Sequence, residues 1–206
     1  MQKPTILCRE GIARKDENMS DNDNQDGLLD STENEALAEA YNRGLELQKA
    51  GDLKGAADAF RQALAFDPAD PGGVSIRLAA IGADEAPEKM PDAYVATLFD
   101  QHADVFDDIL VDELGYCVPL LVRDQIQRLG IGPFERLLDL GCGTGLTGVA
   151  LSDCTSHRTG VDLSERIVEL AYDREVYDDL YVGEAVEFLK EFEEEDGSRP
   201  SWDLIA

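Results

Sequence analysis

Apolar and small residues recur every three or four positions between residues 35 and 68, a spacing that predicts amphipathic helices. Gly51 and Asp52 interrupt this stretch, which indicates a tight turn between two short antiparallel helices. The second helix is expected to end at Asp67, because the residue before a proline avoids the helical conformation. A shorter helix follows, and the whole helical region is assigned to residues 35–82.

Two stretches show no periodicity of apolar residues. Residues 1–34 are polar and rich in Asp, Asn and Glu, so we expect a disordered acidic tail. This tail contains Met19, which is an alternative start of the chain. Residues 83–92 contain two prolines and several charges, and they are predicted to form a linker. Residues 93–206 are assigned to one further domain.

That domain is expected to begin with helices and to continue as alternating strands and helices. Pro119 and Gly130 flank an apolar stripe of helical spacing, as is typical of a helix start and of the residue after a helix end. From Phe134 onward short buried strands alternate with helices, which predicts a parallel sheet with helices on its faces. The predicted strands are 136–140, one ending at Asp162, 180–182 and the final SWDLIA, and the predicted helices begin near Thr144 and span 165–173 and 185–192.

Glycines and carboxylates gather directly after the predicted strands. Ligands of such sheets bind at the carboxyl ends of the strands. Three glycines follow the first strand, where the backbone can approach a ligand closely, and acidic residues end or follow the strands nearby. A carboxylate at the end of the second strand can accept both hydroxyls of a ribose. The candidate cofactor-binding residues are Asp139, Gly141, Gly143, Gly145, Asp162 and Glu184.

The string from Gly143 to Gly148 matches the dinucleotide fingerprint G-x-G-x-x-G, but its register is wrong. The turn begins at Gly141, directly after the strand, and Leu146 stands where a third glycine is expected. Asp139 would repel a pyrophosphate, whereas it suits a cationic ligand. A nicotinamide-dependent oxidoreductase is therefore the weaker alternative.

The string LLDLGCGTG followed by VDLS resembles the first two motifs of the Rossmann-like S-adenosylmethionine-dependent methyltransferases. The resemblance implies an α/β fold with an incomplete Rossmann-like parallel sheet of about four strands, preceded by the helical region. It also implies S-adenosylmethionine as cofactor, with the turn glycines against its methionine portion, Asp162 on the ribose and Glu184 near the adenine. The stretch AYVATLFDQHADVFDDIL resembles the helices that help to cover the cofactor in many members.

The helical region resembles a tetratricopeptide repeat (TPR) over one unit, residues 37–70, with a departure at Arg43. The matching positions are Gly44, Leu47, Ala56, Phe60, Ala63 and Pro68. The order of repeat, linker and methyltransferase domain resembles a bacterial group of predicted methyltransferases that carry such repeats. This resemblance implies a protein partner that docks on the TPR-like region, and the alternative is an ordinary helical hairpin without a partner.

The chain carries 44 acidic and 18 basic residues, which gives a net charge of −26. Because such a chain repels phosphate groups, we expect no nucleic acid, no membrane partner, and a small-molecule or protein substrate. The four cysteines form no C-x-x-C pair and the two histidines stand apart, which predicts no metal site and a reducing, cytoplasmic location. No apolar run approaches the length of about 18 residues that indicates a membrane-spanning helix.

Members of the methyltransferase family usually add further strands after the fourth, so this chain is interpreted as a fragment or a truncated product whose activity is not assumed. No catalytic residue is assigned. Asp203 is interpreted either as an acid near the cofactor or as a solvated acid at a strand end. The predicted function is an S-adenosylmethionine-dependent methyltransferase of unknown acceptor. The alternative is a non-catalytic TPR interaction protein with a vestigial cofactor-binding domain.

Overall fold

The computed structural model describes residues 5–8, 23–193 and 197–206. Its contacts divide the chain into two compact units, one formed by residues 1–13 with 98–206 and the other by residues 14–97. Each unit is described by itself below. The boundaries assigned from the sequence to the tail, the helical region, the linker and the final domain stay predictions.

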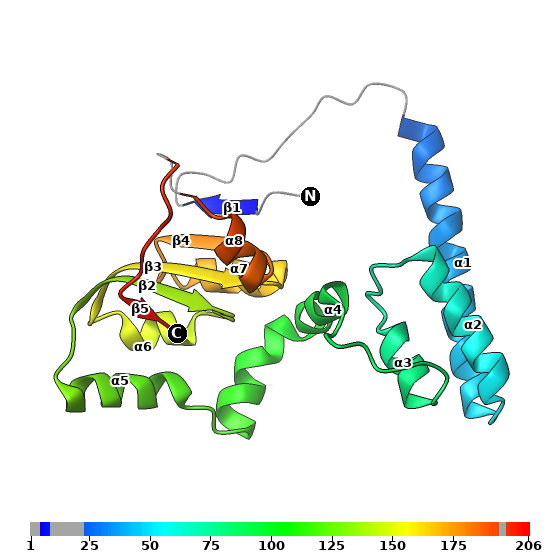
Figure 1. The fold of residues 1–206 in the computed structure, drawn as a ribbon, viewed down its shortest axis with the longest axis horizontal. Coiled ribbons are helices and arrows are strands. Elements are labelled where there is room, and N and C mark those ends of the chain that lie inside the picture. The colour runs from blue at the N-terminus through cyan, green and yellow to red at the C-terminus, as the bar shows by residue number, and fades with distance from the viewer. Residues whose placement is uncertain (1–4, 9–22, 194–196) are drawn as a thin grey trace. The chain divides into compact units, whose positions relative to one another are not determined.

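The helical unit contains α1 (Asp23–Lys49), α2 (Leu53–Phe66) and α3 (Val74–Ala80), and α1 and α2 pack side by side (Figure 1). The turn between α1 and α2 contains Gly51 in a left-handed conformation, with a φ of 83°. Asp52 caps α2 by accepting a hydrogen bond of 2.9 Å from the Gly55 amide. Phe60 is fully buried between the helices, beside Gly44. The core of this unit consists of Ala40, Ala56, Ala57, Phe60, Ala63, Val74 and Leu78.

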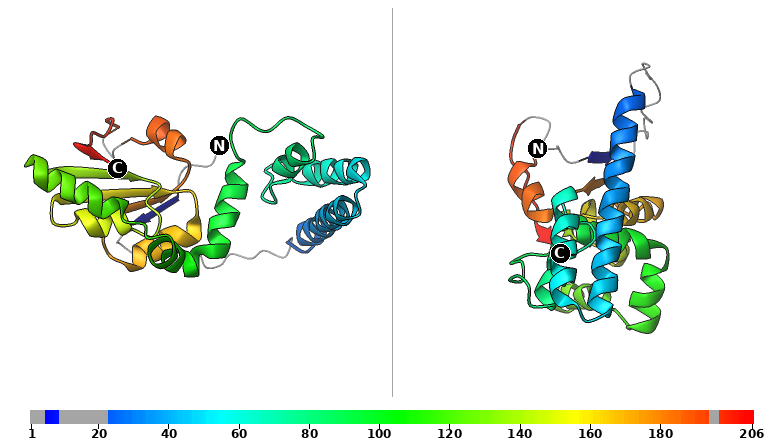
Figure 2. Two further views of the ribbon diagram at one scale, coloured as in Figure 1. Left: turned by 90° about the horizontal axis from the view of Figure 1, so that it is seen from below. Right: turned by 90° about the vertical axis from the view of Figure 1, so that its right-hand side faces the viewer.

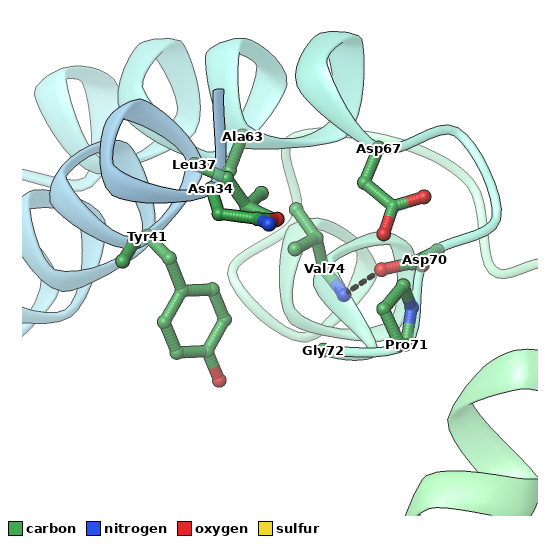
Figure 3. A pocket seen from close by; sticks show the side chains of 10 residues that line it. Asn34, Leu37, Tyr41, Ala63, Asp67, Asp70, Pro71, Gly72 and Val74 are labelled. Carbon is green, nitrogen blue, oxygen red and sulfur yellow. Dashed lines mark hydrogen bonds between the residues drawn. The ribbon is translucent and has the colours of Figure 1, made fainter. Parts of the chain in front are cut away.

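A cavity of about 200 Å³ lies beside α1, between the end of α2 and the start of α3. Figure 3 shows Leu37 and Tyr41 of α1 on one side of it and the segment Asp67–Val74 on the other. Asp70, which is 3% exposed, accepts a hydrogen bond of 2.5 Å from the Val74 amide. That bond fixes the start of α3, so the Asp70 carboxylate in the cavity wall holds the loop.

Two elements lie where the sequence predicted a disordered tail. The helix α1 begins at Asp23, and the strand β1 (Thr5–Cys8) pairs with another strand of the second unit. A helix that is already nucleated by packing extends at low cost, because each added residue gains one backbone hydrogen bond. A strand is likewise held by backbone bonds to its neighbour, which the composition of a polar segment does not reveal.

The second unit is built on a sheet with the strand order β1-β4-β3-β2-β5 (Figure 1). The parallel strands are β2 (Phe134–Leu140), β3 (Thr155–Asp162), β4 (Asp179–Val182) and β5 (Leu204–Ile205), and β1 is antiparallel to β4. The predicted α/β class with a Rossmann-like parallel sheet is confirmed. The antiparallel edge strand β1 was not predicted.

Helices cover both faces of this sheet: α5 (Val118–Leu129), α6 (Leu146–Leu151), α7 (Glu165–Asp173) and α8 (Ala185–Glu191). Leu137 and Leu138 are neighbours in β2 and point to opposite faces, as successive residues of a strand do. Leu137 packs with α5 and α6, whereas Leu138 packs with Phe188 of α8. Figure 2 shows α8 on the other side of the sheet from α6 and α7.

The segment before α5 contains α4 (Asp92–His102), a 3₁₀ helix η1 (Ala103–Val105) and a π-helix η2 (Asp108–Glu113). The sequence predicted helices in this stretch. In the structure the stretch is an α-helix first, then a 3₁₀ helix and finally a π-helix. Among the described residues, no helix is long and apolar enough to cross a membrane.

Candidate functional site

The turn between β2 and α6 gathers the three predicted glycines at the carboxyl edge of the sheet. Gly141, Gly143 and Gly145 all have positive φ angles, of 78°, 54° and 97°. Residues with a Cβ atom rarely adopt this conformation, so the turn depends on glycine. The amides of Gly141 and Cys142 both donate hydrogen bonds to the carbonyl of Val161, at 2.8 and 3.0 Å. The turn is therefore anchored on the end of the neighbouring strand β3.

Asp162 at the end of β3 lies directly against this turn. Its Oδ2 accepts a hydrogen bond of 3.0 Å from the Gly143 amide, and its Oδ1 accepts one of 3.1 Å from the Ser164 amide. The Asp162 carbonyl also accepts a bond of 2.8 Å from Gly183, just after β4. The ends of the neighbouring strands β2, β3 and β4 therefore meet at Asp162.

Asp139 lies near the end of β2 and is almost fully buried, with 3% of its surface exposed. The Tyr177 hydroxyl donates a hydrogen bond of 2.5 Å to Asp139 Oδ2, and Thr147 donates a second bond to the same carboxyl. Burial raises the pKa of Asp139 to about 6, the two hydrogen bonds oppose that rise, and the charge of Asp162 adds to it. A carboxyl with this pKa is ionised at neutral pH and becomes protonated in mildly acidic solution.

Cys142 fills the space beneath the turn. A Cβ atom added at Gly160 of β3 would lie 3.1 Å from its Sγ, so the thiol packs against the strand backbone. Burial raises the pKa of this thiol well above its ordinary value, and the charges of Asp162 and Asp139 add to that rise. The thiol is therefore neutral at physiological pH and has no nucleophilic character, because the thiolate is the reactive form.

Glu184 lies at the same edge of the sheet, two residues after β4. It is the N-cap residue of α8, and its Oε2 accepts a hydrogen bond of 2.8 Å from the Glu187 amide. The fold therefore brings Asp139, the turn glycines and Asp162 into one cluster. Glu184 lies beyond the next strand, in a position set by the start of its own helix.

Asp203 lies at the opposite edge of the sheet. Its two carboxylate oxygens accept hydrogen bonds from the amides of Glu135 and Arg136, at 2.8 and 2.7 Å, at the beginning of β2. These bonds lower the pKa of Asp203. Of the two interpretations that the sequence left open, the position near the cofactor is therefore wrong. Asp203 precedes β5 rather than following it, so it lies at the amino end of the sheet.

Sequence reasoning did not identify the individual residues that hold the turn from the segment before α5. Asp107 accepts a hydrogen bond of 2.5 Å from the Thr144 hydroxyl and also pairs with Arg174. Phe106 lies close to the turn, 3.8 Å from the position of a Cβ atom added at Gly143. These contacts place residues 106–107 beside the turn. The resemblance of residues 93–110 to cofactor-covering helices pointed to this region, but not to these particular contacts, because their partners lie far away in the sequence.

Tyr177 was also missed, although its side chain packs against the turn and the start of α6. Its ring lies 3.2 Å from the position of a Cβ atom added at Gly145 and 2.8 Å from one added at Gly148. Its hydroxyl accepts a hydrogen bond of 3.2 Å from the Gly148 amide. In the part of the chain that the structure describes, no group of three His, Cys, Asp or Glu side chains is placed to hold a metal ion.

No protein-family model matches this chain. A curated 18S rRNA (guanine-N(7))-methyltransferase, RID2 of Arabidopsis thaliana, is 46% identical over 48 residues, which cover 23% of this chain and 17% of the relative. The 18S rRNA (guanine-N(7))-methyltransferase of Bos taurus is 44% identical over 48 residues, with the same coverage of 23% and 17%. The O-methyltransferase rstn1 of Aspergillus nomiae is 28% identical over 92 residues, covering 37% of this chain and 41% of that protein.

Two solved structures are similar over about half of this chain or less. The structure of a complex of DhpI with SAH has a TM-score of 0.39 and 19% sequence identity, and the match covers 53% of this chain and 49% of that one. The structure of YcgJ from Bacillus subtilis has a TM-score of 0.30 and 24% identity, and the match covers 42% and 36%. Both TM-scores are below 0.5, so these likenesses carry no argument about function.

The prediction that excluded nucleic acid is wrong. Curated relatives from three lineages are named as methyltransferases of 18S rRNA, a plant, a mammalian and a slime-mould protein. The prediction rested on the net charge of the whole chain, and a whole-chain charge does not fix the charge of the surface that meets an acceptor. The names of the relatives agree with the methyltransferase class that the sequence motifs predicted.

Proposed function

We propose that the unit formed by residues 98–206 binds S-adenosylmethionine and that the chain is an S-adenosylmethionine-dependent methyltransferase. The observation that carries this proposal is the contact between Asp162 and Gly143, which joins a strand-end carboxylate to a glycine turn at the carboxyl edge of a parallel sheet. Such edges are where ligands of these sheets bind. The methyltransferase names of the curated relatives support the same reaction class.

The shape of the turn fits a ligand that lies against the backbone. A Cβ atom added at exposed Gly141 would meet nothing within 4 Å, and one added at Gly143 would meet only Phe106, at 3.8 Å. The space over this part of the turn is therefore open to a bound molecule. The buried carboxyl of Asp139 supplies negative charge beneath it, which suits a cofactor with a sulfonium and an ammonium group.

Each candidate residue has a definite task in this proposal. Asp162 binds the ribose hydroxyls, because its carboxylate already lies at the end of β3 and is oriented by two backbone amides. The turn glycines allow the methionine portion to approach the backbone. Glu184, beyond β4, receives the adenine side of the cofactor. When bound, the cofactor supplies the methyl group, and the task of these residues is to hold it in one orientation.

Calorimetric binding of S-adenosylhomocysteine to the 206-residue chain tests the proposal directly. Asp162→Ala is expected to weaken binding by about 1–3 kcal/mol, the usual cost of leaving buried polar groups without partners. Asp173→Ala is a matched control, because Asp173 is an exposed carboxylate at the end of α7. If the chain is folded by circular dichroism and binds no S-adenosylhomocysteine, the cofactor proposal fails and the non-catalytic alternative is favoured.

The names of the relatives define the acceptor classes to assay. Transfer of a labelled methyl group should be measured with ribosomal RNA, because three relatives are rRNA methyltransferases, and with hydroxylated small molecules, because one is an O-methyltransferase. Labelling that is lost in the Asp162→Ala variant and kept in the Asp173→Ala control would assign the transfer to this site. Labelling that is equal in both variants would assign it to a contaminant.

We also propose that α1, α2 and α3 form a TPR-like unit. The proposal is supported by the close approach of α1 and α2, which depends on a glycine in α1 and on small alanines in α2. Ala56 and Ala63 are fully buried there, and Phe60 fills the remaining space. The substitution at Gly44 that is described in the Discussion tests this packing.

A further inference from the structure

Tyr177 occupies an unusual position for a residue outside the sequence motifs. It lies between α7 and β4, yet its ring packs beneath the glycine turn and its hydroxyl reaches the end of β2. The hydroxyl donates to Asp139 Oδ2 at 2.5 Å and accepts from the Gly148 amide at 3.2 Å. One oxygen atom therefore links three parts of the candidate site: the strand β2, the helix α6 and the loop that precedes β4.

The direction of the bond to Asp139 is fixed. Burial, together with the charge of Asp139, raises the pKa of the Tyr177 phenol, so the hydroxyl keeps its hydrogen at every physiological pH. Tyr177 is thus a permanent donor, and a carboxylate accepts this hydrogen better than a carboxylic acid does. The bond favours the ionised form of Asp139 in a place where burial disfavours it.

We propose that Tyr177 is a positioning residue of the cofactor site, whose hydroxyl holds the Asp139 carboxylate in place behind the glycine turn and so sets how strongly the site attracts the cationic amino-acid end of the cofactor. This inference rests on the proposed function. Asp139 acts through its charge, because its side chain is 3% exposed. A buried charge acts strongly on a neighbouring cation, because little water screens it.

Few other charged or titratable groups face the Asp139 carboxyl. Thr147 of α6 donates a hydrogen bond, Asp162 of β3 adds negative charge, and Cys142 of the turn is a neutral thiol. Burial brings the pKa of Asp139 to about 6. The attraction for a cation should therefore appear as the pH rises through about 6, and loss of the Tyr177 hydroxyl should move this step to higher pH, because that hydrogen bond lowers the pKa of Asp139.

The test is calorimetric binding of S-adenosylhomocysteine between pH 5.5 and pH 8.5, with the wild-type chain, Tyr177→Phe and Tyr172→Phe. Tyr172→Phe is the matched control, since Tyr172 packs against the same cluster, whereas the bond to Asp139 comes from Tyr177. In Tyr177→Phe the affinity should fall about fivefold more at pH 6 than at pH 8, relative to wild type. 5′-Methylthioadenosine, which lacks the ammonium group, should show no such step with any of the three proteins.

A carboxyl titration by NMR gives a readout that needs no ligand. The resonance of Asp139, assigned with an Asp139→Asn variant, should titrate at a higher pH in Tyr177→Phe and at an unchanged pH in Tyr172→Phe. An unchanged Asp139 titration in Tyr177→Phe overturns the inference. So does a loss of affinity that is equal at every pH, or a Tyr177→Phe chain that does not fold, because either result assigns the hydroxyl to stability alone.

The same measurements separate this inference from the proposed function. If the folded wild-type chain binds neither S-adenosylhomocysteine nor 5′-methylthioadenosine, the proposed function fails, and the inference about the cofactor fails with it. If the wild type binds both ligands but Tyr177→Phe keeps the wild-type pH step, the proposed function stands and only the role of Tyr177 is overturned.

Discussion

Asp203 Oδ1 accepts a hydrogen bond of 2.7 Å from the amide of Arg136, which joins the residue before β5 to the beginning of β2. The second oxygen of Asp203 accepts a hydrogen bond from the neighbouring amide of Glu135, so one carboxylate bridges two consecutive backbone amides. The pairing between β5 and β2 is short, with Leu137 opposite Leu204 and Leu138 opposite Ile205. The side chain of Asp203 therefore extends the attachment of β5 beyond its backbone pairs.

Asp203→Ala should lower the midpoint of thermal unfolding and leave the affinity for S-adenosylhomocysteine unchanged. The hydrogen bonds from the backbone lower the pKa of Asp203 in the folded chain below its ordinary value of 3.8. Its contribution to stability is therefore present above pH 3.8 and is lost as the pH falls through the lowered pKa. The difference between wild type and variant should accordingly shrink in acid. Asp203→Asn keeps one acceptor oxygen and should lose less. A variant with unchanged stability and weakened ligand binding would return Asp203 to the cofactor site.

Asp139→Asn should stabilise the fold at neutral pH while it weakens cofactor binding. The pKa of Asp139 is raised from 3.8 to about 6 in the folded chain, so stability falls as the pH rises between these values. The full cost of the buried charge above pH 6 is about 3 kcal/mol. Denaturant unfolding at pH 7.5 should show a gain of roughly 1–3 kcal/mol, since the Asn oxygen can still accept the Tyr177 hydrogen bond.

The gain from Asp139→Asn should disappear near pH 4, where the carboxyl is protonated in both the folded chain and much of the unfolded one. Comparison of the two pH values therefore serves as the internal control. A variant that is less stable than wild type at pH 7.5 would contradict the buried position of this charge.

Gly148→Ala should destabilise the second unit. The added Cβ atom would lie 2.8 Å from Tyr177 Cζ and 3.0 Å from its hydroxyl oxygen, so the ring or the helix must move. Overpacking of a core of this kind costs about 1–3 kcal/mol. Val149→Ala on the exposed face of the same helix is the control and should change the unfolding free energy by about 0.5 kcal/mol or less. Equal effects of the two substitutions would show that Tyr177 does not lie against α6.

Gly44→Ala tests the packing of the helical unit. Alanine in the middle of an exposed helix stabilises by about 1 kcal/mol relative to glycine. Here the added Cβ atom would lie 2.4 Å from Phe60 Cε1, so we expect destabilisation of about 1–3 kcal/mol instead. The sign of the change in unfolding free energy decides between a close helix contact and an ordinary hairpin. Adding Phe60→Leu to the Gly44→Ala variant should cost less than Phe60→Leu costs in the wild-type chain.

The sequence predicted the local elements well because their determinants are local. The helix α7 begins and ends where the periodicity placed it, at Glu165 and Asp173, and Gly130 ends α5 in a left-handed conformation. The cluster of turn glycines with Asp162 was also predictable, because the parallel order of the strands fixes where their ends lie.

The remaining features depend on partners that are distant in the sequence. Tyr177 lies 38 residues from Asp139, and Asp107 lies 37 residues from Thr144. No spacing rule connects such pairs, because only the packing of α7 and of the segment before α5 brings them together. Asp203 was assigned to two alternative places for the same reason, since the motif SWDLIA does not state which end of its strand meets the site.

The edge strand β1 protects the backbone of its neighbour β4. β1 covers β4 by antiparallel pairing from Thr5 opposite Val182 to Cys8 opposite Asp179. A polypeptide translated from Met19 would lack these residues, and β4 would present its unpaired backbone groups to other molecules, as uncovered strands do when proteins aggregate. The pairing of β1 therefore guards β4 against association with other chains.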